Sequence, residues 1–190
     1  MKRPVALSPL LAAIVLCAGC VVRSIQPWLA DDSRVSEPSL IGAWHDADNH
    51  LAAFFSGSPE EYQILAVNDG KTASRFVATL HRIDDVLLLA VGPTEPDDME
   101  GCALLPGHIL LKAALDGDSL KLYAVDLGSF PERAEKARIP LLAGGSQSDG
   151  YVLTGTSAEA EAFLRAQLAD PGFFDEQPLY SFRKLPVSAE

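Results

Sequence analysis

The chain has 190 residues, is 48% hydrophobic, and carries 15 basic against 26 acidic side chains, which gives a formal net charge of −11. This length and apolar content suffice for a folded domain with a buried core, so the composition excludes a disordered chain. The excess of carboxylates excludes a nucleic-acid-binding protein, because phosphate recognition needs clustered Lys and Arg side chains.

The leader, residues 1–19, has the layout of an export signal. Lys2-Arg3 precedes an apolar run from Val5 to Leu16, and the small pair Ala18-Gly19 follows. A basic start, an apolar centre and small residues at the end are the three parts that an export signal needs. We therefore predict a signal peptide that is cleaved before Cys20.

An uncleaved signal anchor is the alternative interpretation of the same segment. The run from Val5 to Val22 approaches the length that spans a bilayer as a helix. Pro9 lies in the middle of the run, and a plain membrane span would not need a small-small-Cys ending. These two features favour cleavage.

The stretch Leu16-Cys17-Ala18-Gly19-Cys20 resembles the lipobox of bacterial lipoproteins, with Cys17 where Leu is usual. The resemblance implies a diacylglycerol on the sulfur of Cys20 and a further fatty acid, such as palmitate, on its new amine. Each buried methylene contributes about 0.8 kcal/mol, so two or three chains anchor durably in membrane lipid. Val21 stands where Asp would signal inner-membrane retention, which implies the periplasmic face of the outer membrane.

The third cysteine, Cys102, is left without a partner in this scheme. If Cys17 leaves with the leader and Cys20 carries lipid, no internal disulfide can form. The fold must then be stabilised by packing.

A tether is predicted over residues 20–39. Pro27, Pro38 and the acidic pair Asp31-Asp32 interrupt this segment, which shows no sustained periodicity. Within it, the apolar pair Trp28-Leu29 is expected to rest on the domain or on the membrane surface. We expect a single β-rich domain over residues 40–190.

Short alternating runs separated by turn residues predict an antiparallel meander in this domain. The turns are Asn68-Asp69-Gly70, Asp84-Asp85 and Asp116-Gly117-Asp118. One run, Val86–Val91, is apolar throughout, as in a strand that is buried on both faces or closes a barrel. The predicted strands are Leu51–Ser56, Tyr62–Val67, Phe76–His81, Val86–Val91, Ile109–Leu115 and Leu120–Val125.

Two helices and a final strand are predicted after the meander. Ser129 and Glu132 have capping-box spacing before a short helix that ends ahead of Pro140. A second capping box, Thr156-Ser157-Ala158-Glu159, opens a helix that buries one apolar stripe and reaches Leu168. The strand Leu179–Lys184 then returns to the sheet.

Gly42 and Trp44 at the first strand, with Arg183 in the last strand, are similar to the lipocalin and calycin pattern. In that family a Gly-x-Trp closes one end of an eight-stranded barrel and a late Arg packs on the Trp. The resemblance covers about Leu40 to Leu185 by element order and implies a mainly β, barrel-like fold. It assigns these three residues to barrel-end packing or ligand binding. The chain also resembles small bacterial lipoproteins, a likeness that implies no activity.

The densest polar cluster is His45-Asp46-Ala47-Asp48-Asn49-His50, whose residue types could bind a metal. A tight turn points alternate side chains to opposite faces, whereas zinc needs three or four converging ligands. A solvated turn is therefore the favoured interpretation. His81 and His108 each stand alone in strand-like runs and are expected to be surface or core residues.

The remaining candidates for chemistry also favour structural interpretations. The acidic run from Glu95 to Glu100 lacks the spacing of a calcium loop. Ser146 does not fit the Gly-x-Ser-x-Gly elbow and has no His after it, and Cys102 has no neighbouring base. We predict no catalytic residue, metal or cofactor, and no enzyme.

A non-enzymatic binding module for a small apolar ligand in the barrel mouth is the leading functional hypothesis. Its basis is the aliphatic character of both strand faces and the order of the elements. The alternative is an envelope accessory protein that binds a protein partner through its surface, where the excess of carboxylates would attract a basic partner. Both hypotheses place the protein at a membrane through acylated Cys20.

Overall fold

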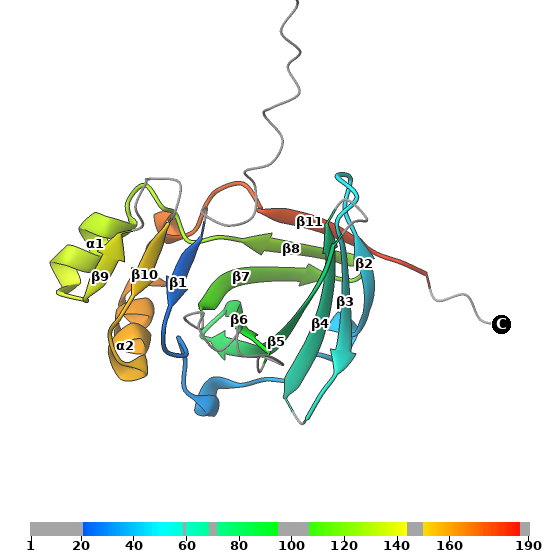
Figure 1. Ribbon diagram of the computed structural model, residues 1–190, viewed down its shortest axis with the longest axis horizontal. Coiled ribbons are helices and arrows are strands. Elements are labelled where there is room, and N and C mark those ends of the chain that lie inside the picture. Colours follow the sequence, from blue (N-terminus) through cyan, green and yellow to red (C-terminus); the bar gives the residue numbers. More distant parts are fainter. Residues whose placement is uncertain (1–20, 59, 69–71, 95–106, 144–149, 187–190) are drawn as a thin grey trace, which may run out of the picture.

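Eight antiparallel strands close into a barrel (Figure 1). The computed structural model describes residues 21–58, 60–68, 72–94, 107–143 and 150–186. Seven barrel strands follow one another in the chain, and the eighth closes the ring by pairing with the last and the first of the seven. The barrel strands are β2 (Gly42–His45), β3 (Leu51–Ser56), β4 (Glu61–Asn68), β5 (Thr72–Ile83), β6 (Val86–Pro93), β7 (His108–Asp116), β8 (Ser119–Tyr123) and β11 (Tyr180–Lys184).

The predicted fold class, a mainly β antiparallel meander with barrel-like closure, is therefore confirmed. Tight turns enforce this topology because neighbouring strands joined by two or three residues must run antiparallel. In the turn between β7 and β8, Gly117 has φ 55°, in the left-handed region that favours glycine. Closing the sheet with β11 leaves no free edge on the barrel itself.

A small side sheet extends from the barrel at β7. It contains β1 (Val22–Ser24), β9 (Leu141–Ala143) and β10 (Tyr151–Leu153). Strand β1 pairs antiparallel with the first part of β7 and parallel with β10, and β10 pairs antiparallel with β9. The side sheet thus joins a segment near the start of the chain with two segments from its second half at one wall of the barrel (Figure 1).

Two helices accompany the side sheet: α1 (Phe130–Ala137) and α2 (Ser157–Gln167). Helix α2 begins with the predicted capping box, in which Thr156 Oγ1 accepts from the Glu159 backbone and the Glu159 carboxylate accepts from the Thr156 backbone. The predicted capping box of α1 does not form, because Ser129 has helical backbone angles and makes no side-chain cap. The carboxylate of Asp126 instead accepts hydrogen bonds from the backbone N–H groups of Gly128 and Ser129. The described residues also contain three short 3-10 turns, at Asp31–Ser33, Pro38–Leu40 and Pro171–Phe173.

The segment predicted as a tether packs into the fold, so the expected start of the domain at Leu40 needs correction for residues 21–39. Strand β1 lies within this segment and pairs on both sides. Trp28 is 0% exposed and Leu29 5%, and the backbone N–H of Val35 donates to the carbonyl of Leu80. Proline and acidic residues had suggested a linker, but the apolar residues between them are buried against the barrel wall.

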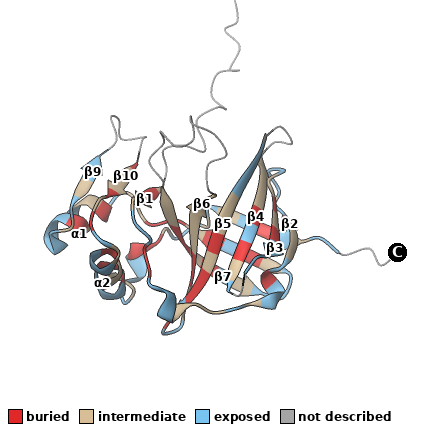
Figure 2. Ribbon diagram, turned by 60° about the horizontal axis from the view of Figure 1, so that its bottom comes forward, coloured by how far each residue is buried: buried red, intermediate tan, exposed pale blue. Residues whose placement is uncertain are grey.

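Two hydrophobic cores share the wall formed by β5, β6 and β7. Alternate side chains of these strands face the barrel interior and the outer layer, which explains the continuous apolar run in β6. Figure 2 shows buried residues alternating with exposed ones along strands of the barrel. The barrel core includes Leu40, Trp44, Phe54, Leu80, Leu89, Leu111, Leu120 and Phe182. The outer core includes Trp28, Leu88, Leu110, Phe130, Leu153, Phe163, Leu164 and Phe173.

Neither helix of the described part of the chain has both the length and the apolar character needed to cross a membrane.

Candidate functional site

The three residues that resemble the lipocalin pattern lie together where β2 meets β11. Trp44 is fully buried and its Nε1 donates to the carbonyl of Leu40 at 2.9 Å. Gly42 has φ 135°, a backbone conformation that residues with a side chain rarely adopt, and the position of an added Cβ lies 2.9 Å from Cε of the flexible Lys184 side chain. Because its side chain is fully buried, Trp44 packs in the barrel core and offers no exposed ring face to a ligand.

The cation beside Trp44 is Lys184 and not the expected Arg183. Lys184 Nζ lies 5.1 Å from the centre of the Trp44 ring, which is cation–π distance. Side chains of a strand alternate between two faces, and buried Phe182 sets the inward face of β11. Arg183 is consequently exposed on the outside, opposite His45 in the register.

The barrel interior offers little room where its lining is described. A void among eight aliphatic side chains of the core has an empty volume of about 220 Å³ but is too narrow for a water molecule. Among its lining residues are Leu40, Leu80, Leu89 and Leu120. A ligand inside this part of the barrel would have to displace packed side chains, which are costly to move.

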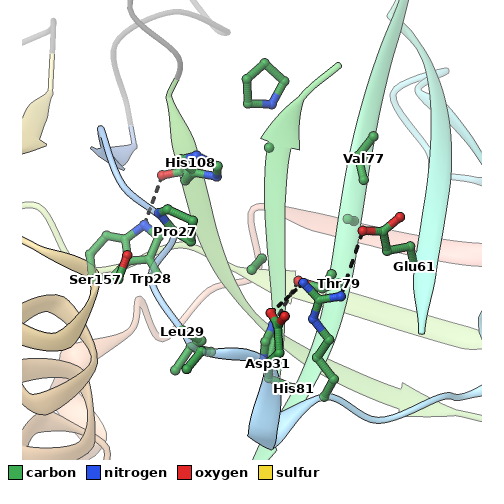
Figure 3. A pocket seen from close by; sticks show the side chains of 16 residues that line it. Pro27, Trp28, Leu29, Asp31, Glu61, Val77, Thr79, His81, His108 and Ser157 are labelled. Atoms are coloured by element: carbon green, nitrogen blue, oxygen red, sulfur yellow. Dashed lines mark hydrogen bonds and ion pairs between the residues drawn. The ribbon is translucent and has the colours of Figure 1, made fainter. Parts of the chain in front are cut away.

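A larger cavity lies on the outer wall of the barrel, and we call it the outer pocket (Figure 3). Its volume is about 530 Å³, within the range typical of small-molecule sites. Strands β5, β6 and β7 form its floor and the segment from Pro27 to Arg34 forms one side. Apolar or aliphatic lining residues include Pro27, Val77, Ala90, Gly92 and Pro93; polar ones include Asp31, Arg34, Glu61, Thr79, His108 and Ser157.

The polar side of the outer pocket is built around the guanidinium of Arg34. Its Nη2 lies 2.7 Å from a carboxylate oxygen of Asp31, and its Nη1 lies 3.8 Å from Glu61, beyond hydrogen-bond distance. Among the described residues, its buried Nε has no hydrogen-bond partner. One cation between two carboxylates gives this side of the pocket a net negative charge.

His81 links the N-terminal segment to β5 through hydrogen bonds. Its Nδ1 lies 2.9 Å from Ser33 Oγ and its Nε2 lies 2.8 Å from Thr79 Oγ1. Burial, followed by the positive charge of Arg34, lowers the pKa of His81 below its ordinary value of 6.5. The imidazole is therefore neutral at pH 7, and both ring nitrogens are occupied by hydroxyl groups.

His108 and Trp28 form the opposite side of the outer pocket. Trp28 Nε1 donates to the carbonyl oxygen of His108 at 2.9 Å, as Figure 3 shows. A Cβ at Gly92 would meet Nδ1 of His108 at 3.1 Å, so the absence of a side chain there lets the imidazole lie close to β6. Burial lowers the pKa of His108.

The polar cluster from His45 to His50 forms the turn between β2 and β3, as predicted. Asp46 Oδ1 accepts the backbone N–H groups of Asp48 and His50, and its Oδ2 lies 2.6 Å from Nδ1 of His50. Burial alone would raise the pKa of Asp46, but the hydrogen bonds from His50 and Asp48 outweigh it and lower the pKa. Ligand atoms of Asp46, Asp48 and His50 lie within 4.8 Å of one another, but these internal bonds already account for their proximity.

Several predicted residues lie outside the described ranges. They are Cys20, Cys102, Ser146 and the acidic run from Glu95 to Glu100.

The outer pocket itself was not predicted. The sequence contained two signals for it, the apolar pair Trp28-Leu29 in a polar segment and the outward alternation of Val77, Thr79 and His81. Only the fold shows that these two segments face each other. No family model, curated protein or solved structure matches this chain.

Proposed function

We propose that this chain is a membrane-anchored lipoprotein whose barrel domain is a non-enzymatic binding module, with its ligand in the outer pocket. The observation that carries the proposal is a cavity of about 530 Å³ on the barrel wall, beside an interior that is tightly packed where its lining residues are described. Pockets of this size bind small molecules through apolar walls and a few placed polar groups. The expected site thus moves from the barrel mouth to the outer wall.

The lining favours a small ligand with an apolar body and one polar group. Val77, Ala90 and Pro93 offer apolar surface, and Asp31, Arg34 and Glu61 lie together at one side. His81, the buried imidazole of the pocket, has both ring nitrogens in hydrogen bonds and is poorly placed to act as a base. This arrangement supports binding without catalysis.

A displacement experiment tests the site. The neutral apolar dye N-phenyl-1-naphthylamine should fluoresce on binding the wild-type protein freed of lipid. Ala90→Trp fills the pocket and should weaken dye binding at least about tenfold, or ~1.4 kcal/mol. Val152→Trp, at a half-buried valine of the side sheet outside the pocket, is the matched control and should bind as the wild type does. Equal binding by both variants, or no binding by the wild type, would contradict the proposed site.

The membrane anchor in this proposal is Cys20. Its support is the lipobox-like stretch before it and the export signal. Mass spectrometry of the mature protein should find an N-terminal cysteine that carries acyl chains, in outer-membrane fractions. Cys20→Ala should leave the chain unacylated, and an intact leader or an unmodified thiol in the wild type would contradict the anchor.

A second candidate function is an accessory protein that binds a basic protein partner. A hollow of about 600 Å³ on the outer face of β3, β4 and β5 is lined by Phe55, Leu65 and Arg75, among others, and Phe55 is 52% exposed. An exposed aromatic beside a hollow is typical of interfaces, and the net charge of −11 attracts basic partners.

A comparison of two exposed residues distinguishes this function from the first. Phe55→Ser should abolish capture of a specific basic partner, and high salt should weaken that capture in the wild type. Leu142→Ser, at a leucine that is 58% exposed elsewhere on the surface, should retain the partner. Equal loss in both variants would count against the hollow.

A further inference from the structure

The distance along the chain between the proposed lipid anchor and the fold is very short. Strand β1 begins at Val22, so only Val21 separates it from Cys20. Two residues span at most about 7 Å when fully extended, whereas a free segment as long as the predicted tether would span several times that distance. Any anchor at Cys20 therefore holds the start of β1 close to the membrane.

The connection to Cys20 could become longer only if strand β1 detached from the sheet, and detachment would break many contacts. It pairs with β7 on one side and with β10 on the other. Val22 is 2% exposed and Ser24 is 0% exposed. Peeling off the strand would expose part of the outer core and break two sets of backbone hydrogen bonds.

We propose that acylation of Cys20 holds the domain flush against the bilayer, with the start of β1, the start of β10 and the end of β9 in contact with the lipid headgroups. This inference rests on the proposed acylation of Cys20. The register places Val22, Tyr151 and Ala143 in one row across these three strands, so they lie at the same level. We call this the membrane edge of the side sheet.

The side chains next to this edge suit a lipid interface. The neighbouring row across the three strands is Arg23, Val152 and Leu142, on the face directed away from the outer core. Leu142 is 58% exposed, the most of the large hydrophobic side chains exposed in the described part of the chain. The exposed Leu142 side chain suits the apolar layer next to the lipid headgroups.

This orientation places the outer pocket on the side away from the membrane. The chain descends from β1 to the segment that begins at Pro27 and lines the pocket (Figure 1). The pocket thus lies past the end of β1 that is opposite the anchor. A ligand would reach it from the aqueous compartment and not from the bilayer.

Spin labels at two positions test this orientation in the acylated protein in vesicles. Two variants, both with Cys102 replaced by Ser, each carry one label. The first is labelled at Ala143→Cys on the membrane edge, and the second at Ser36→Cys, an exposed position after the pocket segment. A paramagnetic nickel-chelating lipid in the vesicles should relax the label at position 143 several-fold more than the label at position 36. Similar relaxation of the two labels would overturn the orientation.

An inserted linker provides the control. About ten Gly and Ser residues between Cys20 and Val21 add roughly 18 Å of flexible reach, while the folded domain is unchanged. The label at position 143 should then relax no more than the label at position 36, and an unchanged difference would overturn the role of the short connection. Mass spectrometry of the same samples separates the two proposals: a chain without acyl groups refutes the anchor itself, whereas equal relaxation in an acylated chain refutes only the orientation.

Discussion

Single side chains in this protein are positioned by the alternation of the strands that carry them. Lys184, one residue beyond the expected Arg183, lies over the Trp44 ring because even-numbered residues of β11 face the barrel. The same alternation points His81 away from the barrel interior, where it makes a hydrogen bond with Ser33 of the N-terminal segment. A one-residue shift along a strand therefore decides whether a charged group lies beside the barrel core or on the outside.

The buried imidazole of His81 makes stability depend on pH. Its pKa is lower in the folded chain, so the unfolded chain binds more protons near and below its ordinary pKa of 6.5. The stability that wild-type His81 contributes is complete above that value and declines as pH falls through it. We expect the difference in unfolding free energy between wild type and His81→Gln to shrink between about pH 8 and about pH 5.5 in urea titrations. A difference that stays constant over this pH range would contradict the prediction.

Trp28→Phe tests whether the N-terminal segment belongs to the fold. The change removes the indole N–H that donates to the His108 carbonyl and leaves a void beside it. We expect a loss of about 1–3 kcal/mol in the free energy of unfolding, measured by chemical denaturation. A residue on a free tether would show no loss.

At the scale of elements, local signals specify most strands and α2, whereas long-range pairing specifies β1 and the side sheet. Strands β3 to β8 are bounded by turn residues, and the capping box marks the start of α2. Strand β1 has three residues, and its partners β7 and β10 come far later in the chain. A three-residue strand is stable only where both neighbours already exist.

Thr156→Ala tests the contribution of the capping box. The variant loses the side-chain oxygen that accepts the backbone N–H of Glu159. We expect a loss of about 1 kcal/mol in unfolding free energy by urea titration. Ser157→Ala, at the first residue of the same helix, is the comparison and should cost less than Thr156→Ala, because the cap is made by the Thr156 side chain.

The molecule as a whole is two cores built on one shared wall. Leu88 faces the outer core and Leu89 the barrel core, and both are almost fully buried in β6. Strands β5, β6 and β7 contribute side chains to both cores. Unfolding of these strands would therefore disrupt both cores together. This coupling also links the outer pocket to the barrel that forms its floor.

A pair of neighbouring substitutions tests the coupling. Leu88→Ala and Leu89→Ala should each lower the free energy of unfolding by about 2–5 kcal/mol. Unfolding followed by near-ultraviolet circular dichroism and by tryptophan fluorescence should remain one coincident transition in both variants. Two separate transitions in either variant would show that the cores unfold independently.

The sequence by itself determined the strand runs, their antiparallel order, the late helix and the final strand, because periodicity and turn chemistry are local properties. It also predicted correctly that the cluster between His45 and His50 is a turn. Only the tertiary structure decided that residues 21–39 are part of the fold, that Lys184 replaces Arg183 beside Trp44, and that a pocket forms on the outer wall of the barrel. These features depend on contacts between segments far apart in the chain, and no local pattern encodes which distant surfaces will meet.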